Sequence, residues 1–66
     1  MKNRIRIERA ILNITQAELA EKVAVSRQTI NAIEAEKYSP SLALGMKIAR
    51  IFSKSVEEVF TLEDED

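Results

Sequence analysis

The stretch from residue 15 to residue 36 constrains the fold most, because it carries the start signals of two short helices. Thr15 is followed three positions later by Glu18. In this capping-box spacing the hydroxyl accepts a backbone N–H and the carboxylate reaches back to the backbone N–H of the cap. Ser26 is a favourable N-cap for a second helix. The stretch therefore predicts a helix, a three-residue turn and a second helix.

The apolar residues of these two helices form narrow stripes. Leu19, Ala20 and Val23 lie on one side of the first helix, and Ile30 and Ile33 repeat at i, i+3 along the second. Neither stripe could bury itself alone, so we expect the two helices to pack against each other.

The opposite face of the second helix is unusual for a solvated surface. At about 100° per residue, the side chains pointing away from the Ile30–Ile33 stripe are Gln28, Asn31, Ala32 and Ala35, with Arg27 on the flank. A solubilising face normally carries Glu and Lys. Amides can pair with adenine, arginine with guanine, and alanine methyls with thymine. We expect the base contacts of a DNA-reading helix to come from Arg27, Gln28, Asn31 and Ala32.

A longer match accompanies this motif. The segment QAELAEKVAVSRQTINAIE resembles the helix-turn-helix of the phage-repressor, or Xre-type, family of DNA-binding regulators, which includes the lambda and 434 repressors and Cro. The flanking segments RIRIERAILNITQ and KYSPSLALGMKIARIFSKSVEEVF resemble the same family, so roughly residues 4 to 60 are covered. The resemblance implies an all-α, five-helix lambda-repressor-like domain with the motif on its second and third helices.

Two positions depart from the family pattern. Many relatives have glycine before the first motif helix and in the turn, where this chain has Asn13 and Ala24. Asparagine tolerates a left-handed conformation, whereas alanine there would cost about 1 kcal/mol. We therefore expect either a strained Ala24 or a slightly different turn.

The resemblance also assigns roles outside the base-reading face. It implies that DNA-backbone contacts come from Gln16, Ser26, Thr29, Lys37 and Tyr38, although Tyr38 could instead cover the edge of the core. It further implies an ion pair between Arg9 and Glu34 that ties the first helix to the third. A contact from Arg9 to phosphate is the alternative.

The remaining helices are predicted from caps and periodicity. The first spans residues 3 to 13, capped by Asn3, with an inward stripe of Ile7, Ala10, Ile11 and Ile14. Relatives commonly have an apolar residue in place of Glu8, so a rotated helix is the alternative. After a loop around Pro40, Ser41 caps a fourth helix, whose core face consists of Leu44, Ile48, Ala49, Ile51 and Phe52.

Ser55 and Glu58 form a second capping box and predict a short fifth helix. Its apolar side chains could form a dimer interface or complete the monomer core, and for the interface we expect Val56, Val59, Phe60 and Leu62. The domain is expected to span residues 1 to 62. Residues 63 to 66 are four consecutive acids and are expected to form a disordered tail.

Charge is unevenly divided along the chain. The formal net charge is −1, but residues 1 to 56 hold all ten Lys and Arg and only five acids, a charge of +5, and residues 57 to 66 hold the other six acids. The basic body suits a polyanion such as double-stranded DNA. The chain contains no Cys and no His, so we expect no disulfide, no metal and no cofactor. With no membrane-spanning run and no signal-peptide pattern, it is expected to be cytoplasmic.

The function expected from these features is sequence-specific transcriptional regulation, acting as a repressing homodimer on a palindromic operator. One alternative is the antitoxin of a toxin–antitoxin module, which would bind both DNA and a toxin protein. A pure protein-interaction module would leave the face of Arg27, Gln28 and Asn31 unexplained. An enzyme is not expected, because no converging acid–base groups or phosphate-cradling loop are present.

Overall fold

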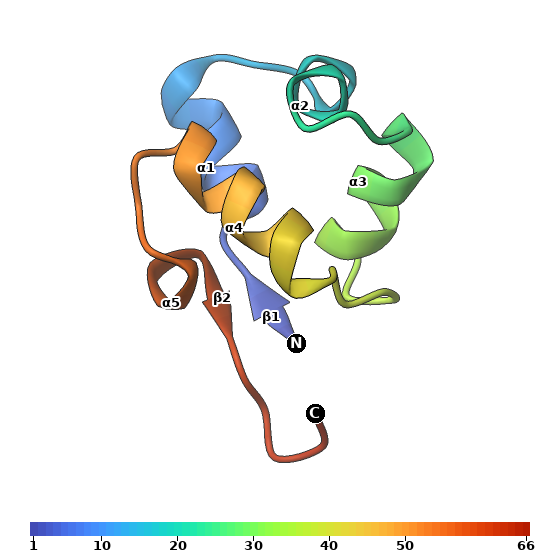
Figure 1. The fold of residues 1–66 in the computed structure, drawn as a ribbon, viewed down its shortest axis with the longest axis vertical. Helices are drawn as coiled ribbons and strands as arrows, with labels where there is room; N and C mark the ends of the chain where they lie inside the picture. The colour runs from blue at the N-terminus through green and yellow to red at the C-terminus, as the bar shows by residue number, and fades with distance from the viewer.

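The computed structural model describes all residues from 1 to 66 as five helices and one pair of two-residue strands. In chain order these are β1 (Lys2–Asn3), α1 (Ile5–Leu12), α2 (Gln16–Lys22), α3 (Arg27–Glu34), α4 (Leu42–Ile51), α5 (Val56–Val59) and β2 (Phe60–Thr61). The helices surround one core, and both chain ends lie at the same end of the molecule (Figure 1). The predicted five-helix, lambda-repressor-like architecture is confirmed. No helix is long and apolar enough to cross a membrane.

The capping signals begin helices where the sequence predicts. Thr15 and Glu18 form the full capping box at the start of α2, and the Ser26 side chain accepts the Thr29 N–H at the start of α3. Ser41 caps α4 in the same way, and Ser55 and Glu58 form the second full box at α5. Each of these bonds joins residues three apart, so local sequence is sufficient to specify them.

The turn between α2 and α3 uses the left-handed conformation despite its alanine. Ala24 has φ of 60° and Asn13, at the C-terminus of α1, has φ of 57°. The expectation of a strained Ala24 is therefore the one observed, and not that of a different turn. The family geometry is retained here at the cost of backbone strain, about 1 kcal/mol for a residue with a Cβ atom.

Every helix contributes to a single apolar core. The buried cluster consists of Ile5, Leu19, Ala20, Val23, Ile30, Ile33, Leu44, Ile48, Ala49, Phe52, Val59 and Phe60. Ile51 packs against it but is only partly buried. The predicted stripes of α2, α3 and α4 all face this cluster, and α2 and α3 pack together as expected.

The prediction for α1 is wrong in both its start and its rotation. The helix begins at Ile5, and its N-cap residue, Arg4, makes no side-chain capping bond. Its buried residues are Ile5 and Glu8, whereas Ile7 is 50% exposed and Ile11 67% exposed. Ala10 is also exposed and Ile14 is only partly buried. The rotated alternative, suggested by Glu8, is therefore correct.

Long-range hydrogen bonds explain this rotation. Asn3 lies in β1, where its side-chain oxygen accepts the Ile5 N–H at 3.2 Å and its amide donates to the Ile33 carbonyl at 2.9 Å. The Arg4 N–H donates to the Val59 carbonyl at 2.9 Å, next to the antiparallel pairing of β1 with β2. The start of α1 is thus oriented by α3 and by the end of α5, neither of which is near it in sequence.

Residues 63 to 66, expected to be disordered, instead fold back toward the N-terminus. The Met1 ammonium lies 3.0 Å from Asp66 Oδ1 and 3.5 Å from Glu63 Oε1. The Glu63 N–H donates to Asp66 at 2.9 Å. This hydrogen bond, followed by the one from the Met1 ammonium, lowers the pKa of the Asp66 carboxyl.

Candidate nucleic-acid interface

The outward face of α3 presents free polar groups. Arg27, Gln28 and Asn31 are exposed and border a shallow hollow of about 170 Å³. Arg27 and Gln28 make no side-chain hydrogen bond or ion pair within the chain, and Asn31 only accepts a long one of 3.4 Å from Gln16. Ala32 is partly buried beside them. The side chains of Arg27, Gln28 and Asn31 therefore keep most of their hydrogen-bonding capacity for an external partner.

The back of α3 is fixed by an ion pair. Arg9 Nε donates to Glu34 Oε2 at 2.7 Å and Arg9 Nη2 donates to Glu34 Oε1 at 3.0 Å. The Glu34 side chain is 2% exposed and that of Arg9 15% exposed. The hydrogen bonds that Arg9 donates to Glu34 raise the pKa of the Arg9 guanidinium above its ordinary value. The bidentate geometry holds α3 at a fixed angle to α1.

Arg9 also donates from Nη1 to the Ile14 carbonyl at 3.1 Å. Three of the five N–H donors of Arg9 are thus engaged by Glu34 and Ile14, and its side chain is only 15% exposed, which favours the structural role over binding phosphate. A second arginine lies near the pair, with Arg6 Nε 3.8 Å from Glu34 Oε1 and the Arg6 side chain 81% exposed. Arg6 was not among the predicted site residues, although its position three residues before Arg9, on the same side of the helix, could have indicated it.

Gln16 is the first residue of α2 and connects this helix to α3. Its amide nitrogen lies 3.2 Å from Glu34 Oε1 and 3.4 Å from Asn31 Oδ1. An amide carries two N–H donors, and both face protein acceptors here. A phosphate contact from the Gln16 side chain would therefore require release of one bond, and the longer one to Asn31 is the weaker.

The other expected backbone contacts lie at the two ends of α3. At its start, the Ser26 hydroxyl is 3.0 Å from the Thr29 hydroxyl as well as accepting the Thr29 N–H, so both hydroxyls are partly engaged. At its end, the Lys37 N–H donates to the Ala32 carbonyl at 3.0 Å. This bond closes the helix and leaves the Lys37 and Tyr38 side chains exposed.

The residues expected at a dimer interface divide into two pairs. Val59 is 1% exposed and Phe60 6% exposed, so both belong to the monomer core. Val56 is partly buried and Leu62 is 77% exposed. Only Val56 and Leu62 could contribute much apolar area to a second copy. The sequence could not separate the pairs because burial of Val59 and Phe60 depends on α4 and β1.

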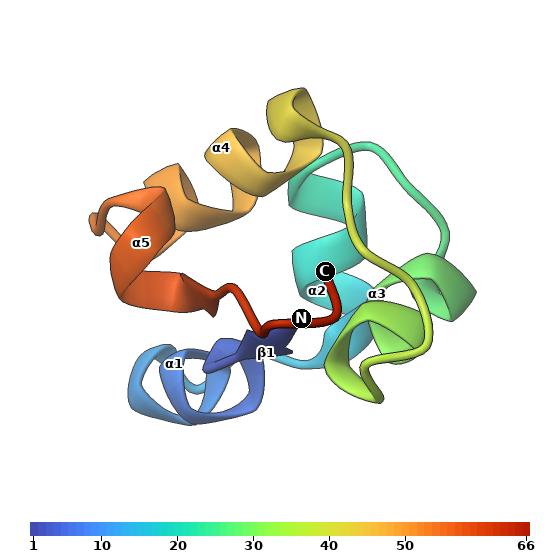
Figure 2. The ribbon, with the colours of Figure 1, turned by 90° about the horizontal axis from the view of Figure 1, so that it is seen from below.

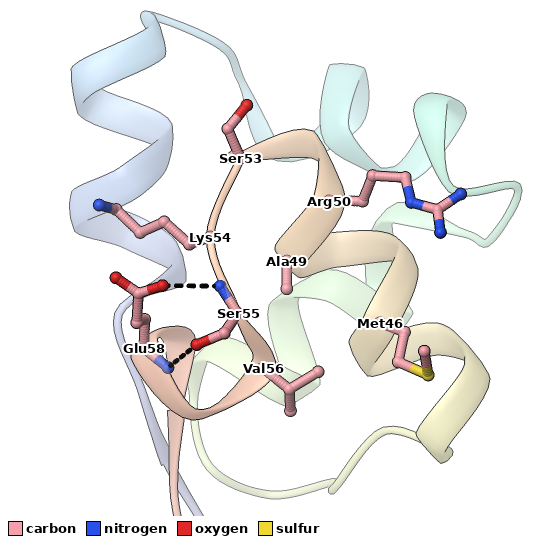
Figure 3. Close-up of a pocket in the computed structure, with 8 residues that line it drawn as sticks. All are labelled: Met46, Ala49, Arg50, Ser53, Lys54, Ser55, Val56 and Glu58. Carbon is pink, nitrogen blue, oxygen red and sulfur yellow. Dashed lines mark hydrogen bonds between the residues drawn. The ribbon is translucent and has the colours of Figure 1, made fainter.

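The largest hollow, of about 490 Å³, lies between α4 and α5 and away from the face of α3 (Figure 3). The Glu58 carboxylate at its border accepts the Ser55 N–H at 2.8 Å, as the dashed lines in Figure 3 show. This bond lowers the pKa of the Glu58 carboxyl. Within the chain, no group of three or more His, Cys, Asp or Glu is placed to hold a metal ion.

Known proteins show the same motif. Residues 5–59 match the sequence model of a helix-turn-helix family. Over 66 residues the chain is 52% identical to the uncharacterized HTH-type transcriptional regulator MJ0272 of Methanocaldococcus jannaschii, covering 100% of both chains. It is 50% identical to an uncharacterized HTH-type transcriptional regulator of Archaeoglobus fulgidus, covering 100% of this chain and 94% of the relative. For the uncharacterized HTH-type transcriptional regulator YgzD of Bacillus subtilis the identity is 47%, with 100% of both chains covered.

The geometry and the comparisons agree. Two capped helices joined by a tight turn place an exposed polar face on the second helix. The relatives that align with this chain over their whole length are named as uncharacterized HTH-type transcriptional regulators. The chain belongs to the Xre-type, lambda-repressor-like helix-turn-helix family of DNA-binding transcriptional regulators.

Proposed function

We propose that this regulator binds a two-fold symmetric operator as a homodimer, reading bases through α3, and that it represses transcription by occupying that site in the cytoplasm. The observation that supports base reading is the exposed, unpaired set of Arg27 and Gln28 beside Asn31 on α3. Such a face is stable in the free protein only because water satisfies it. Base edges in the major groove can replace that water.

Backbone positioning and base reading should be separable by mutation. Gln28→Ala should cost about 1 to 3 kcal/mol on the preferred site and relax the preference at one or two base pairs. Lys37→Ala should weaken binding to all sequences similarly, because a phosphate contact carries no sequence information. Lys47→Ala on α4, which removes the same charge from another exposed position, is the matched control.

The experiment begins with selection of bound duplexes from a random pool, followed by titration of each variant on the selected site and on scrambled duplex. Loss of affinity in both Gln28→Ala and Lys37→Ala without any change in sequence preference would contradict base reading by α3. Failure to enrich any sequence would contradict the proposed function itself.

Salt dependence tests the backbone contacts independently. A dimer that neutralises roughly six to ten phosphates should lose about 10³ to 10⁵ in affinity between about 50 and 200 mM salt. Affinity that does not change with salt would rule out docking on the phosphate backbone.

A further inference from the structure

We propose that a hollow between the end of α2 and the second half of α4 is a binding site for a small anion that carries a diphosphate group. Three cationic side chains border this hollow, Lys22 on α2 and Lys47 and Arg50 on α4. The hollow lies outside the face that the proposed function uses, and the inference does not depend on DNA binding. It follows from the charge of the hollow, the absence of acids in its lining and the apolar surface between the cations.

The hollow is formed by two segments that are far apart in sequence, and its volume is about 270 Å³. Figure 3 shows the Arg50 side chain extending from α4 away from Val56 and Glu58, toward the segment that follows α2. Lys47 and Arg50 are three residues apart, so they share one side of α4. The lining consists of three cations and three apolar residues, namely Lys22, Val23, Ala24, Lys47, Arg50 and Ile51.

The three cations are not neutralised within the chain. All three side chains are exposed, and none takes part in an ion pair. α4 contains no Asp or Glu. On α2, Glu18 lies one turn before Lys22, but its carboxylate accepts the Thr15 N–H in the capping box. With three cations and no acid in its lining, the hollow carries a formal charge of +3.

The arginines of α1 differ in this respect, because each lies near an acid. Arg4 is 3.6 Å from Glu8, and Arg9 donates to Glu34 at 2.7 Å. Around the hollow, by contrast, only water and dissolved ions relieve the repulsion between the cations. An anion bound between them would relieve it directly, because opposite charges attract most strongly at short range.

The lining also indicates which anion fits. The planar guanidinium of Arg50 matches two oxygens of a phosphate group, and the lysine ammonium groups act as point charges beside it. Three cations suit the charge of a diphosphate better than that of a single carboxylate. Val23, Ala24 and Ile51 provide apolar surface for the organic part of a ligand. The diphosphate group is common to inorganic pyrophosphate and to nucleoside diphosphates.

The hollow is separate from the expected DNA-reading face. None of its lining residues belongs to α3, whereas Arg27, Gln28 and Asn31 border the hollow on α3. In both views the second half of α4 lies apart from α3 (Figures 1 and 2). Ala24 lies in the turn that leads from α2 into α3. A bound anion would therefore contact this turn without occupying the reading face.

Titration of the ¹⁵N-labelled protein with inorganic pyrophosphate tests the site, and the amide chemical shifts report where it binds. Sodium sulfate at the same ionic strength shows the general effect of salt. Pyrophosphate should shift the signals of residues 22–25 and 47–51 and reach saturation. Arg50→Ala should raise the dissociation constant about tenfold, because it removes charge-assisted hydrogen bonds. Lys22→Ala and Lys47→Ala should each raise it about threefold, as expected for exposed point charges.

Lys54→Ala is the matched control, because Lys54 is an exposed cation that borders other hollows. This variant should bind pyrophosphate like the unmodified protein, and circular dichroism verifies that each variant is folded. Adenosine diphosphate distinguishes the two sources of the group. Tighter binding than that of pyrophosphate indicates a nucleotide, and equal or weaker binding indicates free diphosphate.

Three outcomes would overturn the proposed site. These are equal shifts with sulfate and pyrophosphate, shifts confined to α3, and an unchanged dissociation constant in Arg50→Ala. No DNA is present in these titrations, so their outcome is independent of whether the protein enriches a DNA sequence.

Discussion

α1 and α3 are both eight-residue helices with a polar and an apolar side, yet only α3 is oriented as its sequence predicts. α3 starts at a serine cap and buries Ile30 and Ile33. The N-cap residue of α1, Arg4, makes no side-chain capping bond, and the helix buries Ile5 and Glu8 while leaving Ile7 and Ile11 in water. An amphipathic pattern therefore predicts that a helix forms, but the face that turns inward depends on what anchors the helix.

The two helices are anchored in different ways. α3 follows α2 after a tight turn and packs directly on it, so its cap and its neighbour are both local. α1 is anchored by Asn3 to Ile33, by Arg4 to Val59 and by Arg9 to Glu34. Each of these contacts joins distant parts of the chain, and together they outweigh the preference for burying Ile7 and Ile11.

The largest expected effect tests the rotation of α1. Ile5→Ala should lower the free energy of unfolding by about 2 to 5 kcal/mol, because the removed atoms leave a cavity in the core. Ile7→Ala removes the same atoms from an exposed position and should change it by no more than about 0.5 kcal/mol. Urea unfolding of both variants measures the difference. A larger loss for Ile7→Ala than for Ile5→Ala would mean that α1 is rotated as the sequence pattern suggested.

The next effect tests the anchor between the two helices. Glu34→Gln keeps the shape of the side chain but removes the charge that accepts from Arg9, and should cost about 2 to 3 kcal/mol. Glu36→Gln, two residues later and exposed, should be close to neutral. Thermal unfolding compares the two variants. Similar melting temperatures for Glu34→Gln and Glu36→Gln would show that the pair does not hold α3 on α1.

A smaller effect concerns the local cap at α2, which α1 lacks. The hydrogen bond from the Thr15 N–H lowers the pKa of the Glu18 carboxyl below its ordinary value of 4.5. A carboxyl with a lowered folded-state pKa contributes stability above its unfolded pKa and loses it as the pH falls through the folded pKa. The stability difference between the unmodified protein and Glu18→Gln should therefore be full at neutral pH and shrink below pH 4.5.

Urea unfolding across this acidic range measures the Glu18 effect. Glu21→Gln, on the exposed side of the same helix, serves as control and should follow the profile of the unmodified protein. A constant gap between Glu18→Gln and the unmodified protein at all pH values would contradict a contribution from the ionised cap.

The smallest effect concerns the two left-handed residues that end α1 and α2. Ala24→Gly should raise the free energy of unfolding by up to about 1 kcal/mol, because relief of the strain at φ of 60° exceeds the added entropy of the unfolded chain. Asn13→Gly should be nearly neutral, since asparagine tolerates this conformation. Chemical unfolding distinguishes them. A destabilised Ala24→Gly would show that the turn is not strained.

Much of the candidate site could be predicted because it depends on short-range sequence. The start and exposed face of α3 follow from Ser26, the isoleucine spacing and the 100° step of a helix. The engagement of Gln16 by Glu34 and Asn31 could not be predicted in this way, because it depends on the angle between α2 and α3. The hydrogen bond from the Asn3 amide to the Ile33 carbonyl, near the end of α3, could not be predicted either, because no sequence pattern links residues 30 positions apart.

By itself the sequence determined the five helices, four of their N-terminal caps and the polar character of the α3 face, because each rests on residues within one or two helical turns. Tertiary structure alone decided the rotation of α1, the burial of Val59 and Phe60 in the monomer and the return of residues 63–66 to Met1. The physical reason is that these features depend on contacts between residues far apart in the chain. The free energy gained by burying one side chain depends on which other side chains occupy the same core.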